Sequence, residues 1–344
     1  MRHVITGGSG FLGNLLARRL RAAGDEVVLI DVWEDQTRPK DNKFVNCDVL
    51  NRDLVRSTLA GADIVHHTAA LVPLTKSREK FHQVNVVGSQ IVAEESAAAG
   101  VKCFIHASSS AIFGAPACPA DNNSPLLPLE IYGKSKLEGE LAVRAVAEKT
   151  GMKLVAVRPR TILGEERLGI FQILFDWIKD GSNIFVLGDG SNKIQFLHAD
   201  DLIDAYMLVY QVGKPGLYNV GTDSYGTLRN DLETLCRHAN SKTRVIGLPE
   251  QAAIAALECL DKLRLSPLAP WHYLTYGKDF YFDLKPLLEI GWKPKYSNDR
   301  MLRESYDSFL ANHAQLSAVT TGSAHRKPVK ERALRVLKVL SKLV

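Results

Sequence analysis

Two residues whose types and spacing could carry chemistry, Tyr132 and Lys136, lie in the segment Tyr-Gly-Lys-Ser-Lys. If this segment is helical, side chains four residues apart share one face. Removing hydride from a carbinol carbon requires a base for the hydroxyl proton, and a free tyrosine, with a pKa of about 10, is a poor base at neutral pH. A neighbouring ammonium group stabilises the phenolate and lowers its pKa. The pair therefore indicates acid–base chemistry at an alcohol or ketone, although the same spacing is common on solvated helix faces.

A glycine-rich turn near the N-terminus separates a short apolar strand, Val4–Thr6, from a helical pattern over Phe11–Ala23. Gly8, Gly10 and Gly13 fit the pattern G-x-G-x-x-G. Glycines let the backbone turn tightly and approach a pyrophosphate, whose charge meets the helix N-terminus. The pattern alone is weak evidence, but its position between a strand and a helix predicts a dinucleotide site.

An acidic residue strengthens this prediction. Asp31 follows Gly13 by 18 residues and ends a second strand, Glu26–Ile30. A carboxylate at this place accepts hydrogen bonds from the adenosine ribose and repels a 2′-phosphate. The sequence therefore predicts NAD, and not NADP, as the cofactor; the alternative is a structural glycine turn beside a solvated aspartate.

Strand and helix patterns alternate from the N-terminus to Arg158, which predicts an α/β fold with a Rossmann-type, doubly wound parallel sheet. The further elements that we expect in this part are strands at Phe44–Asn46, Ile64–His67 and Cys103–Ala107 and helices at Asp53–Leu59 and Lys80–Ala99. After Pro159 the alternation weakens. There we expect helices at Ile170–Lys179, Asp201–Tyr210, Leu228–His238 and Gln251–Leu263 and strands at Ile184–Val186 and Leu217–Asn219.

These patterns divide the chain into four parts. We predict an NAD-binding Rossmann domain with the catalytic residues (1–165), a smaller α/β substrate-binding lobe (166–313), a linker (314–327) and a basic amphipathic helix (328–344). The last helix carries apolar residues at helical spacing and basic residues largely opposite them. It would either pack on protein or lie at an anionic membrane surface as a peripheral contact.

Composition excludes several classes of protein. The net charge of +5 comes from the tail, because seven basic residues and one acidic residue follow His325, which leaves about −1 for the rest. A nucleic-acid partner is therefore not expected. The five cysteines show no metal-binding or disulfide pattern, so we expect no metal site. With no apolar run of about 18 residues and no leader pattern, we expect a cytoplasmic protein.

Several motifs in order resemble the extended short-chain dehydrogenase/reductase superfamily, and in particular its NAD-dependent epimerase/dehydratase family. Thr6-Gly-Gly-Ser-Gly-Phe-Leu-Gly13 resembles its T-G-x-x-G-x-x-G signature, and Asp48-Val49, His67-Thr-Ala-Ala70 and Asn85-Val-Val-Gly88 resemble later segments. The resemblance covers about residues 1–309. It implies a homodimer and the following cofactor-binding residues: Gly7, Gly8, Gly10, Phe11, Leu12, Gly13, Asp31, Asp48, Val49, Thr68, Ala69, Ala70, Asn85, Tyr132, Lys136 and Pro159.

The resemblance also implies a third catalytic residue. Ser108-Ser-Ser-Ala-Ile-Phe-Gly114 is similar to the family segment S-[ST]-x-x-[VI]-Y-G, whose second residue hydrogen-bonds the reacting oxygen. Alignment on its last three residues makes this residue Ser109, with Ser108 and Ser110 as the alternatives if the loop slips. The implied catalytic triad is therefore Ser109, Tyr132 and Lys136.

Acidic residues that are missing from this loop argue against two of the reactions that the family catalyses. The 4,6-dehydratases of the family carry Asp-Glu where this chain has Ser110 and Ala111, and the glutamate of the family's decarboxylases is also missing. A segment at 187–202 resembles the G-D-G…R-D-F-V-H-V-D-D stretch of sugar epimerases, although Ile194 replaces its arginine. The resemblance thus implies epimerisation of a nucleotide-linked or lipid-linked sugar through a keto intermediate, in the manner of the sugar-nucleotide 4-epimerases. Arg160, Lys193 and Lys278 are candidates for the phosphate contacts that Ile194 cannot make.

Two alternatives remain open at this point. The segment His67–Pro73 and the apolar helix Gln251–Leu263 would suit an apolar substrate, as in a 3β-hydroxysteroid dehydrogenase or another alcohol/ketone oxidoreductase. A non-catalytic NAD-binding protein is the other alternative. Single-turnover reduction of NAD by a substrate would separate an enzyme from such a protein.

Overall fold

The computed structural model describes residues 1–36, 42–73, 80–164, 167, 169–263, 270–318, 338 and 341. The strands of the main sheet are β1 (Arg2–Thr6), β2 (Glu26–Asp31), β3 (Lys43–Asn46), β4 (Ile64–His67), β5 (Cys103–Ala107), β6 (Leu154–Pro159) and β10 (Gly216–Val220). Within the described residues, these seven strands form one parallel sheet in the order β10-β6-β5-β4-β1-β2-β3. The chain starts near the middle and winds outward in both directions, which confirms the predicted Rossmann-type α/β class.

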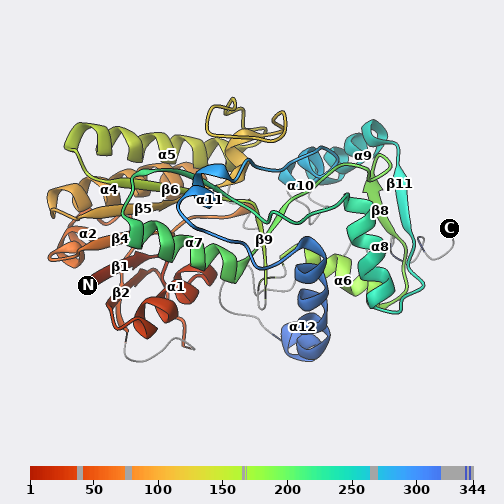
Figure 1. Cartoon of the computed structure of the whole chain (residues 1–344), viewed down its shortest axis with the longest axis horizontal. Coiled ribbons are helices and arrows are strands. Elements are labelled where there is room, and N and C mark those ends of the chain that lie inside the picture. The colour runs from red at the N-terminus through yellow and green to blue at the C-terminus, as the bar shows by residue number, and fades with distance from the viewer. Residues whose placement is uncertain are drawn as a thin grey trace.

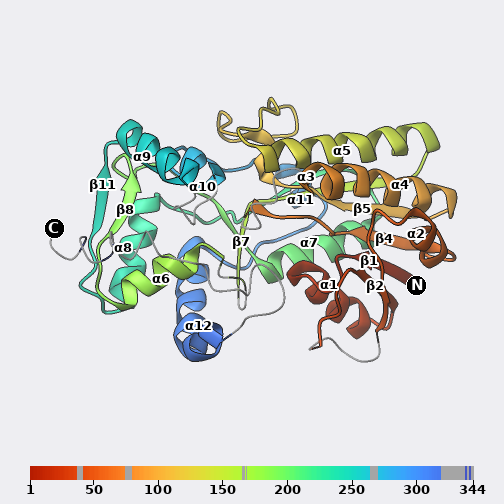
Figure 2. The same cartoon turned by 180° about the vertical axis from the view of Figure 1, so that it is seen from behind.

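Helices cover both faces of this sheet. The helices α1 (Phe11–Ala22) and α7 (Ala199–Val212) lie on one face, and α2 (Arg52–Leu59), α4 (Ser89–Ala98) and α5 (Ile131–Thr150) lie on the other (Figures 1 and 2). Successive strand residues point to opposite faces, so Val4 packs in the cluster under α2 and α4, and its neighbour Ile5 packs in the cluster under α1 and α7. The central strands are therefore buried on both faces, as is usual in parallel sheets, and most of their residues are apolar.

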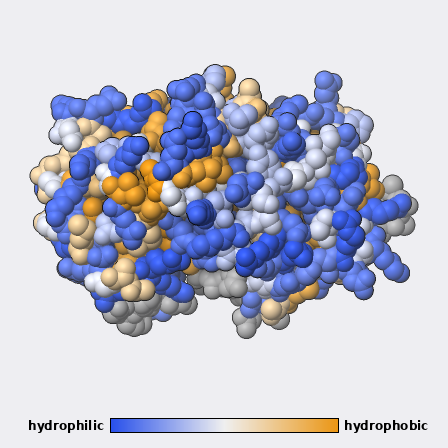
Figure 3. Space-filling view, viewed as in Figure 1, coloured by the Kyte–Doolittle hydropathy of each residue, from blue (hydrophilic) through white to orange (hydrophobic). Residues whose placement is uncertain are grey.

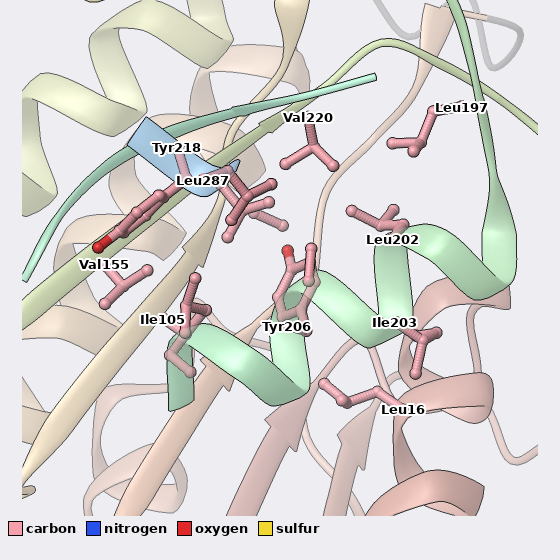
Figure 4. Close-up of a cluster of buried hydrophobic side chains, with 14 of the residues drawn as sticks. Leu16, Ile105, Val155, Leu197, Leu202, Ile203, Tyr206, Tyr218, Val220 and Leu287 are labelled. Carbon is pink, nitrogen blue, oxygen red and sulfur yellow. The ribbon is translucent and has the colours of Figure 1, made fainter. Parts of the chain in front are cut away.

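The edge strand β10 and the helix α7 correct the division that we predicted at residue 165. The sequence patterns gave both elements correctly, but placed them in the smaller lobe. In the structure β10 pairs with β6, and Leu202 and Tyr206 of α7 pack with Ile105 of β5 in the main core (Figure 4). The cause is the apolar face of α7, which covers sheet residues that α1 leaves open.

The smaller lobe is built from short elements around a second core. Its strands are β7 (Thr161–Leu163), β8 (Ile184–Leu187), β9 (Phe196–His198) and β11 (Val245–Leu248), which pair as β7-β9 and β8-β11. Its helices are α6 (Phe171–Lys179), α8 (Leu228–His238), α9 (Glu250–Lys262), α10 (Pro270–Thr275) and α12 (Asn298–Ala318), whereas the short α11 (Lys285–Glu289) packs on the main core. Phe175, Leu235 and Phe309 are at the centre of the second core.

The helix expected at Lys80–Ala99 is interrupted. It consists of α3 (Lys80–His82), a π-helical turn (Gln83–Gly88) and α4. In the π-helical turn, the carbonyl of Asn85 lies so close to Gly139 of α5 that a Cβ on the glycine would be 2.1 Å away. The turn and α5 therefore pack backbone against backbone, and π-helical turns of this kind are often found at functional sites.

The C-terminal predictions fall largely outside the described residues. The predicted linker begins too early, because α12 continues to Ala318 through alanine, glutamine and leucine, which favour helices. Of the predicted amphipathic helix at 328–344, only Lys338 and Ser341 are described. The ammonium group of Lys338 forms ion pairs with Asp176 and Asp180, and the carbonyl of Ser341 accepts a hydrogen bond from Asn183 at 2.8 Å.

No described helix is long and apolar enough to cross a membrane. On the face shown in Figure 3 the surface is mostly hydrophilic, and its larger hydrophobic area lies over the half that carries the sheet. Val212 and Leu288 are among the large hydrophobic side chains that remain exposed, at 46% and 42%. Most other large apolar side chains lie in the clusters described above.

Four histidines of β1, β4 and β5 are buried, and they stack in two pairs across neighbouring strands, His3 with His66 and His67 with His106. His67 and His106 lie opposite each other with ring centroids 5.6 Å apart. His67 is hydrogen-bonded to Thr6 and Ser89, whereas neither ring nitrogen of His106 has a hydrogen-bond partner among the described residues. Burial lowers the pKa of His67 to about 3 and that of His106 well below its usual value.

We predict that His106 makes folding sensitive to acid. As the pH falls below about 6.5, the unfolded chain takes up a proton that folded His106 does not, so the free energy of unfolding falls by about 1.4 kcal/mol per pH unit for this residue. The free energy of unfolding of His106→Leu should therefore fall less steeply with decreasing pH, by about that amount. Urea denaturation at neutral and mildly acidic pH measures this slope. His82→Leu, which removes an exposed imidazole, is the control. Parallel pH profiles for wild type and His106→Leu would contradict the prediction.

Candidate active site

A cavity of about 590 Å³ lies at the carboxyl edge of the main sheet. Residues that end or follow five parallel strands contribute to its wall: Gly7 after β1, Asp31 at the end of β2, Thr68 after β4, Ser108 after β5 and Pro159 at the end of β6. From the other side, Ile170, Phe171, Trp271 and Tyr276 of the smaller lobe close the wall. Ligands of open α/β sheets bind at this edge.

The glycine turn has the geometry of a phosphate cradle. Gly7 has a φ of +71°, and a Cβ there would be 2.7 Å from the backbone nitrogen of Ala69. A Cβ on Gly13 would be 2.3 Å from the carbonyl oxygen of Gly7. Gly10 is the N-cap of α1 and offers no capping side chain, so the positive end of the helix faces the cavity wall. Larger residues would fill the space that a pyrophosphate needs.

The carboxylate of Asp31 is held at the end of β2, on the same wall. It accepts hydrogen bonds from the backbone N–H groups of Ser9 at 3.0 Å and Val32 at 2.8 Å. Burial raises the pKa of Asp31, and these N–H groups oppose that rise. The glycine cradle and this acceptor fit the diphosphate and ribose of NAD.

Of the predicted cofactor-binding residues, all but two line the cavity. Gly8 lies behind the wall, where its N–H donates to the carbonyl of Ile30 and its Cα packs against Leu29. The side chain of Asn85 is buried and exchanges hydrogen bonds with the backbone of Leu71, at 2.8 and 3.2 Å, and donates to Ser135 at 3.0 Å. Because these contacts tie the cavity loop to α5, Asn85 is a positioning residue in this structure and not a lining one.

The three predicted catalytic residues come together on the cavity wall. The ammonium group of Lys136 donates to the carbonyl of Ala107 at 2.6 Å, and the hydroxyl of Ser109 accepts a hydrogen bond from the N–H of Ala111 at 3.1 Å. Burial raises the pKa of Tyr132, while the nearby hydroxyl of Ser109 and the positive charge of Arg167 lower it. Burial also lowers the pKa of Lys136 to about 8. A phenol, a hydroxyl and an ammonium group are thus arranged for proton transfer at a substrate oxygen.

The start of α5 fixes Tyr132 in this position. The carboxylate of Glu130 caps the helix by accepting hydrogen bonds from the N–H groups of Tyr132 at 2.7 Å and Gly133 at 2.6 Å. A Cβ on Gly133 would be 2.7 Å from the carbonyl oxygen of Ala111, so only glycine lets the helix approach the serine loop this closely.

A buried charge network, which the sequence analysis missed, lies behind the triad. Glu140 accepts hydrogen bonds from Ser108 at 2.6 Å and from Arg158 Nε at 3.0 Å, and forms a second contact with the same guanidinium. The side chains of Glu140 and Arg158 are 0% and 1% exposed. The available signal was the position of Glu140, four residues after Lys136 and eight after Tyr132 on the same helix face.

The three candidates for phosphate contacts differ in the structure. Arg160 lines the cavity, whereas Lys193 is exposed and outside it. Lys278 is also outside the wall, and its ammonium group pairs with Glu250 at 2.6 Å. The cavity is also lined by four residues that no sequence motif indicated: Thr161, Arg167, Trp271 and Tyr276. They could not be predicted because no pattern in the sequence shows that these distant segments meet.

Comparison with known proteins agrees with this geometry. The model of the NAD dependent epimerase/dehydratase family matches residues 3–221. An uncharacterized protein of Sinorhizobium fredii is 39% identical over 343 residues, which cover 99% of this chain and 86% of that protein. The sterol-4-alpha-carboxylate 3-dehydrogenase (decarboxylating) of Homo sapiens is 29% identical over 212 residues, or 60% of this chain and 57% of that protein.

Among solved structures, the UDP-glucuronic acid 4-epimerase from Bacillus cereus in complex with NAD is similar to this chain with a TM-score of 0.74. The two are 20% identical, and the match covers 90% of this chain and 99% of that one. At this level of identity the likeness establishes the fold.

The position of Asp31 predicts which dinucleotide binds. A 2′-phosphate would face the buried carboxylate, so NAD(H) should bind at least about tenfold more tightly than NADP(H). Asp31→Asn removes the charge with little change of shape and should reduce the difference between the affinities for NAD(H) and NADP(H). Quenching of the fluorescence of Trp33, which lines the same wall, can follow both titrations. Equal binding of the two dinucleotides by the wild-type chain would contradict this interpretation of the site.

Proposed function

Since the chain belongs to the NAD-dependent epimerase/dehydratase family, we propose that it catalyses NAD-dependent oxidoreduction at a sugar hydroxyl. We propose further that the reaction is an epimerisation of a nucleotide-linked or lipid-linked sugar through a transient ketone. The observation that carries the proposal is that Ser109, Tyr132 and Lys136 line the same cavity as the glycine cradle and Asp31. The homodimer and the membrane contact stay predictions.

In this proposal the triad moves one proton in each half of the reaction. The chemistry that bound NAD supplies is removal of hydride from the carbinol carbon and its return to the opposite face of the ketone. Tyr132 takes the hydroxyl proton in the first half and gives it back in the second. Ser109 donates a hydrogen bond to the reacting oxygen, and the nearby ammonium group of Lys136 stabilises the phenolate.

The residues around the triad support epimerisation over elimination. Loss of water from a keto sugar needs an acid and a base beside the ring, and the loop offers Ser110 and the buried methyl group of Ala111. Neither side chain exchanges a proton at neutral pH. Epimerisation and one-way oxidoreduction of an alcohol need only the triad and NAD, so this loop is compatible with both reactions and not with loss of water.

One observation favours a second candidate, a dehydrogenase of sterols or other apolar alcohols. The cavity wall includes the apolar residues Leu71, Val72, Pro73 and Trp271, and three relatives are sterol-4-alpha-carboxylate 3-dehydrogenases. Such an enzyme would use the same triad in one direction only. The two candidates differ in whether NADH accumulates.

We predict that Tyr132→Phe leaves NAD binding nearly intact and lowers turnover by at least about a hundredfold, the usual scale for a general acid–base group. The phenyl ring keeps the packing against Phe81 but cannot exchange a proton. Tyr218→Phe removes a hydroxyl outside the cavity, bonded to the carbonyl of Lys214, and should keep the wild-type rate. A nearly normal rate for Tyr132→Phe would remove this residue from the chemistry.

We also predict the fate of the migrating hydrogen. With a panel of nucleotide sugars deuterated at the reacting carbon, an epimerase should form the epimer without net NADH, and the deuterium should stay on its carbon. Mass spectrometry of the product and NADH absorbance measure the two outcomes. Accumulation of NADH in proportion to product would favour the dehydrogenase instead, and exchange of the deuterium with solvent would exclude both.

A further inference from the structure

The side chain of Arg160 lies on the cavity wall and packs over the aromatic ring of Phe280. The residue follows β6, and its N–H donates to the carbonyl of Val220 in β10 at 2.9 Å. Its side chain is 4% exposed, and the guanidinium carbon lies 3.6 Å from the ring centroid of Phe280. Its Nε donates to the carbonyl of Gln195 at 3.1 Å, which fixes the plane of the group.

Among the described residues, this buried cation has no counter-charge. A guanidinium carries five N–H donors, and the Nη1 nitrogen of Arg160 is buried without a hydrogen-bond partner. No carboxylate among the described residues forms an ion pair with it. The face of Phe280 offsets part of the cost of burial by a cation–π contact, but it does not satisfy the remaining donors. Burial lowers the pKa of Arg160 to about 10, so the group still carries its charge at neutral pH.

A second buried arginine, Arg158, has a carboxylate partner and can be compared with Arg160. Arg158, two residues earlier, is equally buried and meets the carboxylate of Glu140 through two of its nitrogens. Arg160 has no such partner in the part of the chain that the structure describes, and unlike Arg158 it lines the cavity. It is therefore a cation on the cavity wall with no described carboxylate beside it.

We propose that Arg160 is the binding site for an oxyanion of the substrate, either a carboxylate on the reacting sugar or a phosphate of the group that carries it. The planar fork of a guanidinium binds both groups in bidentate geometry. A neutral sterol or an unsubstituted sugar would leave the cation unpaired. This inference rests on the proposed function, in which the cavity holds NAD together with a hydroxylated substrate.

The test uses the full-length, NAD-loaded protein and calorimetric titration with UDP-glucuronate, UDP-glucose and UDP. Arg160→Met removes the cation, Arg160→Lys keeps the charge without the fork, and Lys193→Met removes an exposed cation outside the cavity as the control. Loss of a hydrogen-bonded charge should weaken binding at least about tenfold in Arg160→Met. The affinity of Arg160→Lys should lie between those of the wild type and Arg160→Met. The affinity of Lys193→Met should match that of the wild type.

The ligands separate the two sources of the oxyanion. Weaker binding of UDP-glucuronate alone assigns Arg160 to a sugar carboxylate, and weaker binding of all three assigns it to the diphosphate. Equal affinity of wild type and Arg160→Met for every ligand that the wild type binds overturns the proposal. A lower melting temperature of Arg160→Met with unchanged affinities would likewise overturn it, by showing a purely structural arginine.

If the wild type binds none of the three ligands, the nucleotide-sugar form of the proposed function fails, and Arg160 is tested separately. Inorganic pyrophosphate and sodium glucuronate are then added to the NAD-loaded protein in thermal denaturation. A rise in the melting temperature of the wild type that Arg160→Met does not share upholds the oxyanion site. No rise in the wild type with either anion overturns it.

Discussion

The buried ion pair between Glu140 and Arg158 holds the three elements that form the candidate active site. Ser108, which follows β5, Glu140 in α5 and Arg158 in β6 are joined by hydrogen bonds, and the side chains of Glu140 and Arg158 are buried. Because a buried charge that loses its partner is costly, each element constrains the other two. Ser109 follows Ser108, and Lys136 lies one helical turn before Glu140, so the network sets the distance between the loop and the helix that carry the triad.

The sequence allowed the fold class and most of the candidate site to be predicted because both depend on local patterns. The glycine turn needs a strand before it and a helix after it, and the Tyr132–Lys136 spacing needs only a helix. The cavity wall accordingly includes Gly7, Asp31 and Ser109 as expected. The side chain of Asn85 lies behind this wall and joins a loop to α5, so its contact with the cofactor stays a prediction.

Features that arise from contacts between distant segments could not be predicted in this way. The π-helical turn before α4 follows from the close approach of Gly139, which no local pattern reveals. Phe280 comes beneath Arg160 from a segment about 120 residues later, so the sequence offered Arg160 only as one of three basic candidates. The pairing of β10 with β6 could not be predicted for the same reason, because the residues of a strand do not indicate which strand lies beside it.

That pairing has a consequence for how the chain folds. A polypeptide ending at residue 165 would leave β6 as an unpaired edge, with the core residues that meet Leu202 and Tyr206 exposed to water. Such an edge invites pairing with other chains. The main sheet therefore cannot be completed during synthesis until residues beyond Val220 have been made, and closing a loop of this length makes the step slow. The smaller lobe is made of two stretches of chain, one before β10 and one after it, and its core joins Phe175 of the first stretch to Leu235 and Phe309 of the second. That core can therefore form only after the last strand of the main sheet has been made.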